Sequence, residues 1–170
     1  MPTLEPKLLS ELSPAFIPAD LLAEIERSPL PPLGSGGGDA ALSERLQGGQ
    51  ISSGEGRDLP PSAVAGLWLL AGDLDRSHSI SQGIEDRDGS FWHAIMHRRE
   101  GDFGNAKYWF RRVGSHPVLD RLAVTDYGDA YDFVDRCEAA RNRDDRTLCD
   151  LQWLEWQRLF AHVLTREGSR

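Results

Sequence analysis

The chain has 170 residues, of which 39% are hydrophobic, enough for one domain with additional chain outside its core. Its net charge of −8 argues against general binding to nucleic acids or anionic membranes, because phosphate groups would be repelled. The longest apolar run, near Ala63–Ala71, is too short to cross a bilayer, and the N-terminus lacks the basic and apolar regions of a signal peptide.

Residues 1–61 are predicted to form a flexible, acidic arm. Nine of the ten prolines lie in this part, and eight glycines lie between positions 34 and 56. Such a segment loses much chain entropy on folding and buries little apolar surface. We therefore expect residues 29–61 to be loop or disordered linker.

One short helix is predicted in the arm after Pro18. Leu21, Leu22 and Ile25 fall on one face of it and can dock on the main domain. Ala40–Leu46 can add a further turn or two of helix.

Residues 62–170 are predicted to be an all-α domain of antiparallel helical hairpins with a long C-terminal helix, since no segment alternates as a strand does. The expected helices are about Ser62–Leu70, Leu74–Ile84, Ser90–Arg99, Phe103–Val113, Pro117–Val124, Asp129–Ala140 and Asp145–Arg166. Aspartates stand where N-caps are needed and glycines where helices should end. The last helix is apolar over more than half its circumference, so we expect it to pack centrally.

A short internal repeat is visible at an offset of 29 residues. The string Ala71–Leu74 aligns with Glu100–Phe103, and the small Ser77 aligns with the small Ala106. Each copy reads as a helix, a Gly-Asp turn and a second helix, with a small residue where the two backbones approach.

Gly101, Asp102 and Phe103, followed by Ala106, Phe110 and Pro117, resemble the second half of a tetratricopeptide or Sel1-like repeat. The longer string Trp92–Val113 also resembles an uncharacterised family of bacterial and fungal proteins. The repeat families imply partner binding on a concave surface, although this chain has too few repeats to form a groove and carries His93 where those repeats are usually apolar.

The candidate site is the stretch of residues 92–116, which is basic in an acidic protein. It holds five Lys/Arg against two acids, with three of the five histidines. Arginine side chains match carboxylate, sulfate and phosphate, and aromatic rings stack on planar groups. The predicted ligand-binding residues are His93, His97, Arg98, Arg99, Glu100, Asn105, Lys107, Tyr108, Trp109, Arg112 and His116.

Two functions follow from this stretch. The first is a non-enzymatic module, without a cofactor, that binds an acidic peptide or a small anion; internal pairing of the same cations with acids is an equally good explanation. The second is an enzyme, metal-dependent or acid–base. His93, His97 and Glu100 form one stripe on a helix and can hold Zn or Fe, with His78 or His116 as a further ligand.

The histidines and cysteines carry two further expectations. Arg98 and Arg99 stand beside His93 and His97, so we expect neither histidine to be readily protonated near neutral pH. Cys137 and Cys149 lie on apolar stretches and are predicted to be core residues. They form no disulfide framework, which favours a cytoplasmic protein with reduced thiols.

Overall fold

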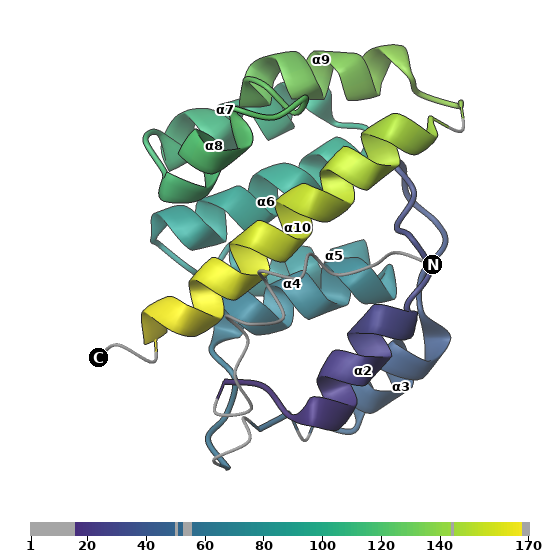
Figure 1. Cartoon of the computed structure of the whole chain (residues 1–170), viewed down its shortest axis with the longest axis vertical. Helices are drawn as coiled ribbons and strands as arrows, with labels where there is room; N and C mark the ends of the chain where they lie inside the picture. The colour runs from purple at the N-terminus through teal and green to yellow at the C-terminus, as the bar shows by residue number, and fades with distance from the viewer. Residues whose placement is uncertain (1–15, 50, 53–55, 144, 168–170) are drawn as a thin grey trace.

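The protein is described by a computed structural model that covers residues 16–49, 51–52, 56–143 and 145–167 (Figure 1). The fold is all-α, as predicted, and an isolated bridge between Ser52 and Asp58 is the β-pairing within these ranges. The helices are α2 (Ala19–Arg27), α3 (Ala40–Gln47), α4 (Pro61–Ala71), α5 (Leu74–Ser81), α6 (Arg87–Glu100), α7 (Phe103–Val113), α8 (Pro117–Leu122), α9 (Ala130–Ala139) and α10 (Arg146–Glu167). No helix in the described ranges is both long and apolar enough to cross a membrane.

The long helix α10 crosses the face formed by α4 and α6, with α2 and α3 at one end of the molecule and α7, α8 and α9 at the other (Figure 1). Trp156 of α10 lies against Trp92 of α6, with ring centroids 6.2 Å apart, and its Nε1 donates a hydrogen bond of 2.8 Å to the Gly66 carbonyl of α4. The central packing expected for the last helix is therefore present, and α10 joins both hairpins to one core.

The two predicted hairpins are α4–α5 and α6–α7, and their turns have the same conformation. Gly72 and Gly101 both take a left-handed backbone, with φ of 87° and 91°, and each is followed by an aspartate that caps the next helix. In the first hairpin the Ser77 hydroxyl donates to the Ala65 carbonyl at 2.9 Å, so a small residue does stand where the two helices approach. The resemblance of the second hairpin to a tetratricopeptide or Sel1-like repeat stays a prediction.

The short helix expected after Pro18 is α2, and the further turns expected at Ala40–Leu46 form α3. Asp39 caps α3 by accepting from the Leu42 amide at 3.1 Å. Leu21 and Ile25 of α2 and Leu42 and Leu46 of α3 are buried in the same core as α4. In each of these helices, burial of two apolar side chains one turn apart offsets the chain entropy that the glycine-rich segment loses on folding. The boundary at residue 61 stays a prediction, and residues 1–15 lie outside the described ranges.

The start of α6 is the clearest shift in a helix boundary. We expected Ser90, but the helix starts at Arg87, because the Asp86 carboxylate accepts from the Gly89 amide at 2.9 Å and acts as N-cap. This earlier start places Asp88 on the first turn, where it is 1% exposed. A buried acid in α6 thereby becomes part of the polar interior described below.

Candidate functional site

The predicted site residues do not converge on one place. Helix α6 is buried on nearly every side, and its polar residues point to different neighbours. His93 and His97 face α5 and α7, Arg98 faces α10, and Arg99 reaches the end of α4. The basic stretch is therefore split into separate clusters by the helix that carries most of it.

The first cluster contains His78 of α5 with His93 and His97 of α6. One ring nitrogen from each lies within 4.8 Å of the others. His93 stacks on Trp109 with ring centroids 3.9 Å apart, and His97 Nδ1–H donates to Glu100 Oε1 at 2.8 Å. The predicted stripe of His93, His97 and Glu100 is thus present, with Glu100 bonded to a histidine.

The pKa of His93 is lowered to about 3. Burial is the main cause, followed by the neighbouring His97 and His78 and the charge of Arg112. The expected direction is confirmed for His93, but the predicted cause was wrong: the adjacent Arg98 and Arg99 point to other neighbours.

The second cluster is a buried polar network around Arg98. Its Nη1 donates to Glu155 Oε1 of α10 at 3.0 Å, its Nη2 donates to Glu155 and Gln152, and the Tyr127 hydroxyl donates to Glu155 Oε1 at 2.5 Å. Burial disfavours the charged guanidinium, but the Glu155 carboxylate outweighs this effect and raises the pKa of Arg98. Arg98 is therefore neutralised inside the protein, as in the alternative of internal pairing.

Arg99 has no such carboxylate. Arg99 is only 3% exposed, and its Nη1 donates to the Leu69 carbonyl at the end of α4. Its Nε has no hydrogen-bond partner among the described residues. Burial and the charge of Arg98 lower the pKa of Arg99 to about 10, so the guanidinium still carries its charge at neutral pH.

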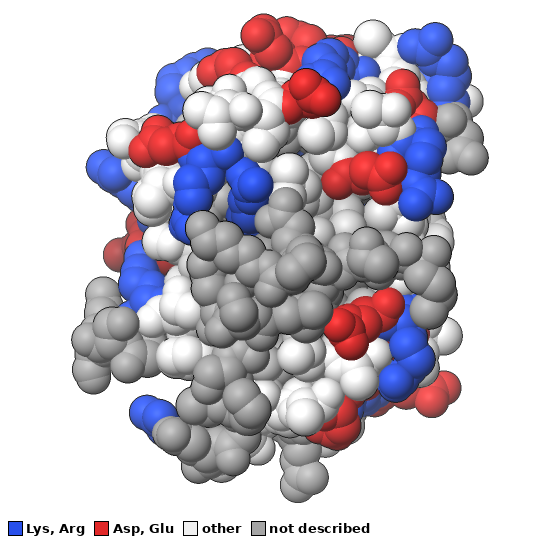
Figure 2. All heavy atoms as spheres, viewed as in Figure 1, with Lys and Arg blue, Asp and Glu red and all other residues white. Residues whose placement is uncertain are grey.

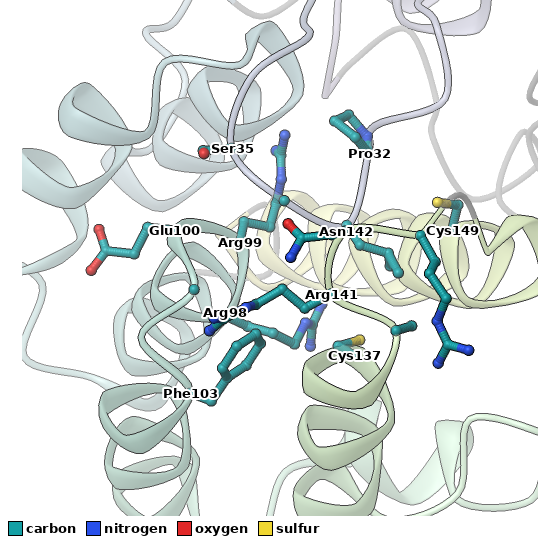
Figure 3. Close-up of a pocket in the computed structure, with 15 residues that line it drawn as sticks. Pro32, Ser35, Arg98, Arg99, Glu100, Phe103, Cys137, Arg141, Asn142 and Cys149 are labelled. Carbon is teal, nitrogen blue, oxygen red and sulfur yellow. The ribbon is translucent and has the colours of Figure 1, made fainter.

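Arg99 lines a cavity of about 550 Å³ between the end of α6, the α9–α10 connection and the loop at residues 32–35 (Figure 3). Arg141 and Arg143 also line it, and Glu100 is the acid in its lining. Figure 3 shows the Glu100 carboxylate pointing away from the other labelled side chains. The cavity thus carries positive charge that no carboxylate of the described residues neutralises at Arg99.

Arg98, Ser35 and Asn142 add further polar groups to the cavity wall, and much of the rest of the wall is apolar. Leu33, Phe103 and Ala140 line it together with Cys137 and Cys149. Both cysteines are buried, as predicted, and neither forms a disulfide; burial raises the pKa of the Cys137 thiol to about 11. Cys137 is therefore a protonated wall residue and a poor nucleophile at neutral pH.

The third cluster surrounds His116, which lies apart from the other two predicted histidines. His116 Nε2–H donates to Asp88 Oδ1 at 2.9 Å, and its Nδ1 accepts from the Val118 amide at 3.2 Å, which caps α8. These partners assign one proton, on Nε2. His162 Nε2 lies 3.4 Å and Arg166 Nη1 lies 2.9 Å from Asp88.

The remaining predicted residues lie on the outside of α7. Lys107 pairs with Asp135 of α9, and the Asn105 side chain donates to Asp102 at 2.7 Å. Arg112 lies over the Trp109 ring, 5.0 Å from its centroid, and Tyr108 is exposed. On the face shown in Figure 2, basic and acidic side chains are interspersed over the upper part of the molecule. The exposed cations of α7 therefore form no common site with Arg99.

Several residues of these clusters were not found from the sequence. Glu155 lies among Trp153, Leu154 and Trp156, and a carboxylate within an apolar helix is a signal for a buried partner. Arg141 and Arg143, and the loop at residues 32–35, carry no comparable signal. They line the cavity only because the fold brings residues 32–35 and 141–143 next to the end of α6.

No protein-family model matches the chain, and comparison with curated proteins and with solved structures also gives no match. The clusters are therefore interpreted from their own geometry.

Proposed function

We propose that the protein is a binding module for a small organic anion, held in the cavity lined by Arg99. One observation carries this function: Arg99 is a buried, charged guanidinium whose Nε has no partner and which has no carboxylate among the described residues. Leaving such a charge unpaired is costly, and a bound anion removes that cost. Arg141 and Arg143 add positive charge at the entrance.

The walls of the cavity favour a ligand with an apolar part. A volume of about 550 Å³ lies within the range of small-molecule sites. Phe103, Leu33 and the two thiols can contact a hydrocarbon or ring, while Arg99 donates to a carboxylate or phosphate group. An acidic peptide is the second partner class, because a Glu or Asp side chain presents the same carboxylate.

The test is a series of small anions that differ in charged group and in apolar part. Inorganic phosphate, phenyl phosphate and citrate are titrated into the protein by calorimetry, with the melting temperature as second readout. We expect phenyl phosphate to bind more tightly than phosphate, since its ring is buried in the cavity. Absence of binding by all three anions at millimolar concentration would overturn the proposal.

Arg99→Met tests whether an anion binds in this cavity or only to positive charge elsewhere on the protein surface. A hydrogen bond to a charged group contributes about 1.5–3 kcal/mol, so phenyl phosphate should bind at least about 10-fold more weakly. The apo variant should keep its stability, because the Leu69 carbonyl still accepts from the Gly72 amide at 3.2 Å. Arg111→Met, which removes an exposed arginine of α7, is the matched control and should bind as the parent protein does.

A further inference from the structure

The histidine cluster of α5 and α6 has the composition of a metal site. His93 and His97 are four residues apart on α6 and project on one side of it, and His78 comes from the antiparallel neighbour α5. The three donor nitrogens lie within 4.8 Å of one another. A tetrahedral ion with bonds of about 2.0–2.1 Å needs donors roughly 3.4 Å apart, a distance that small ring rotations can supply.

The ring nitrogens of this cluster are unusually free of other partners. His93 Nδ1 is buried without a hydrogen bond, and among the described residues no hydrogen bond is found to the ring of His78. Buried polar atoms in proteins are nearly always paired. A metal ion would supply the partner that the described residues do not provide.

Glu100 has the place of a supporting residue for His97. It accepts from His97 Nδ1 at 2.8 Å, which leaves His97 Nε2 as the atom that can bind a metal. A carboxylate in this position fixes the ring and increases the basicity of the ligand nitrogen. Glu100 therefore orients a ligand here, whereas the sequence suggested that it was a ligand itself.

The charges around the cluster can accommodate a divalent ion. Arg112, which lies over the Trp109 ring, is the cation that acts on His93. Two acids oppose it on the His97 side, since donor atoms of Glu100 and Asp102 lie within 4.8 Å of His97. The Arg98 charge is neutralised by Glu155 on another side of α6.

We propose that His78, His93 and His97 bind one divalent transition-metal ion, with zinc the best match and Glu100 holding His97 in position. Imidazole suits zinc and its neighbours in the first transition row, whereas magnesium and calcium require oxygen ligands. Three histidines leave the fourth position of a tetrahedral zinc ion for water or a further ligand. This site is separate from the anion cavity, and neither depends on the other.

The test uses full-length protein without a polyhistidine tag, freed of metal by a chelator and dialysed. Zn²⁺ is titrated by calorimetry, and Co²⁺ is titrated by visible absorption, where tetrahedral nitrogen ligation gives intense d–d bands. We expect one Zn²⁺ per chain, a higher melting temperature, and a Co²⁺ spectrum that Zn²⁺ abolishes. No binding at micromolar concentration, or a weak octahedral Co²⁺ spectrum, would overturn the proposal.

Three variants locate the site. His78→Gln should abolish tight binding and keep the apo melting temperature, because His78 is half-buried and its ring makes no hydrogen bond to the described residues. Glu100→Gln should weaken Zn²⁺ binding about 10- to 100-fold with unchanged stoichiometry, as for other residues that orient a ligand. His162→Gln tests the second histidine cluster, with Asp88 and His116. His162→Gln should leave Zn²⁺ binding unchanged. If His162→Gln lost Zn²⁺ binding while His78→Gln kept it, the metal site would not be the one proposed here.

Discussion

Arg98 of α6 and Glu155 of α10 form an ion pair in which neither side chain is exposed to solvent. Tyr127 and Gln152 complete the network, and Gln152 Nε2 also donates to the Pro32 carbonyl at 3.0 Å. One arginine thus links the central helices to the loop at residues 32–35, which lines the cavity beside Arg99. The pair holds α6 and α10 in one register. It also neutralises Arg98, which the sequence analysis had predicted to bind a ligand.

Glu155→Gln should destabilise the protein strongly. Removing one member of a buried pair leaves the other charge uncompensated, which costs about 3–5 kcal/mol. Urea denaturation of the parent and variant measures this difference. Replacing both partners, as in Arg98→Met with Glu155→Leu, should recover most of the loss, because no buried charge then remains. Equal instability of the single and double variants would show that packing, not charge, dominates.

An exposed ion pair provides the control for this measurement. Arg146 and Asp150 lie on α10 with side chains 67% and 54% exposed. Arg146→Gln should change the unfolding free energy by less than about 1 kcal/mol.

Asp88→Asn should reduce stability more at pH 6 than at pH 2.5. Burial disfavours the Asp88 carboxylate, but hydrogen bonds from His116 and His162 and the charge of Arg166 outweigh it and hold the pKa of Asp88 well below its ordinary value. A depressed folded-state pKa gives stability that is complete above the ordinary pKa of 3.8 and is lost as the pH falls through the folded-state pKa. Urea denaturation at both pH values measures the gap, and a gap independent of pH would contradict this reasoning.

The neutral state of His93 predicts a second pH dependence, at a higher pH. Its folded pKa of about 3 lies below the ordinary 6.5, so the unfolded chain binds a proton first as the pH falls. Stability from this group is therefore present above pH 6.5 and declines between pH 6.5 and 3. In metal-free protein, the imidazole carbon proton resonances of His93 should not titrate between pH 5 and 8. A midpoint inside that range would contradict the burial of His93.

Gly66→Ala should destabilise the protein, because the contact between α4 and α6 leaves no room there. An added Cβ would lie 2.7 Å from Cζ2 of the Trp92 ring, which is fully buried. Overpacking of this kind typically costs about 1–3 kcal/mol.

Gly104→Ala is the matched control for Gly66→Ala. Gly104 also lies inside a helix, α7, but its nearest neighbour to an added Cβ is 3.9 Å away. The gain in helix propensity should then stabilise the protein by up to about 1 kcal/mol. Thermal unfolding of both variants distinguishes the two effects, and a stabilised Gly66→Ala would show that Trp92 can move.

The sequence by itself determined the helices of residues 62–170 and the two hairpin turns. Helices are local structures, so the apolar period along α7, with Ala106, Phe110 and Val113 buried, and the caps Asp73 and Asp102 sufficed to place them. The sequence also placed His93, His97 and Glu100 on one stripe, since their spacing depends only on the helical repeat.

Only the tertiary structure decided which neighbour each polar residue of α6 faces. Arg98 and Arg99 are adjacent in sequence, yet successive residues on a helix point about 100° apart. Arg98 therefore pairs with Glu155 of α10, whereas Arg99 donates to the Leu69 carbonyl at the end of α4, although both line the same cavity. Their partners Glu155 and Leu69 lie 57 and 30 residues away along the chain, and local sequence carries no record of such pairings. The separation of one basic stretch into a buried ion pair, an arginine without a carboxylate partner among the described residues and a histidine cluster is thus a consequence of packing.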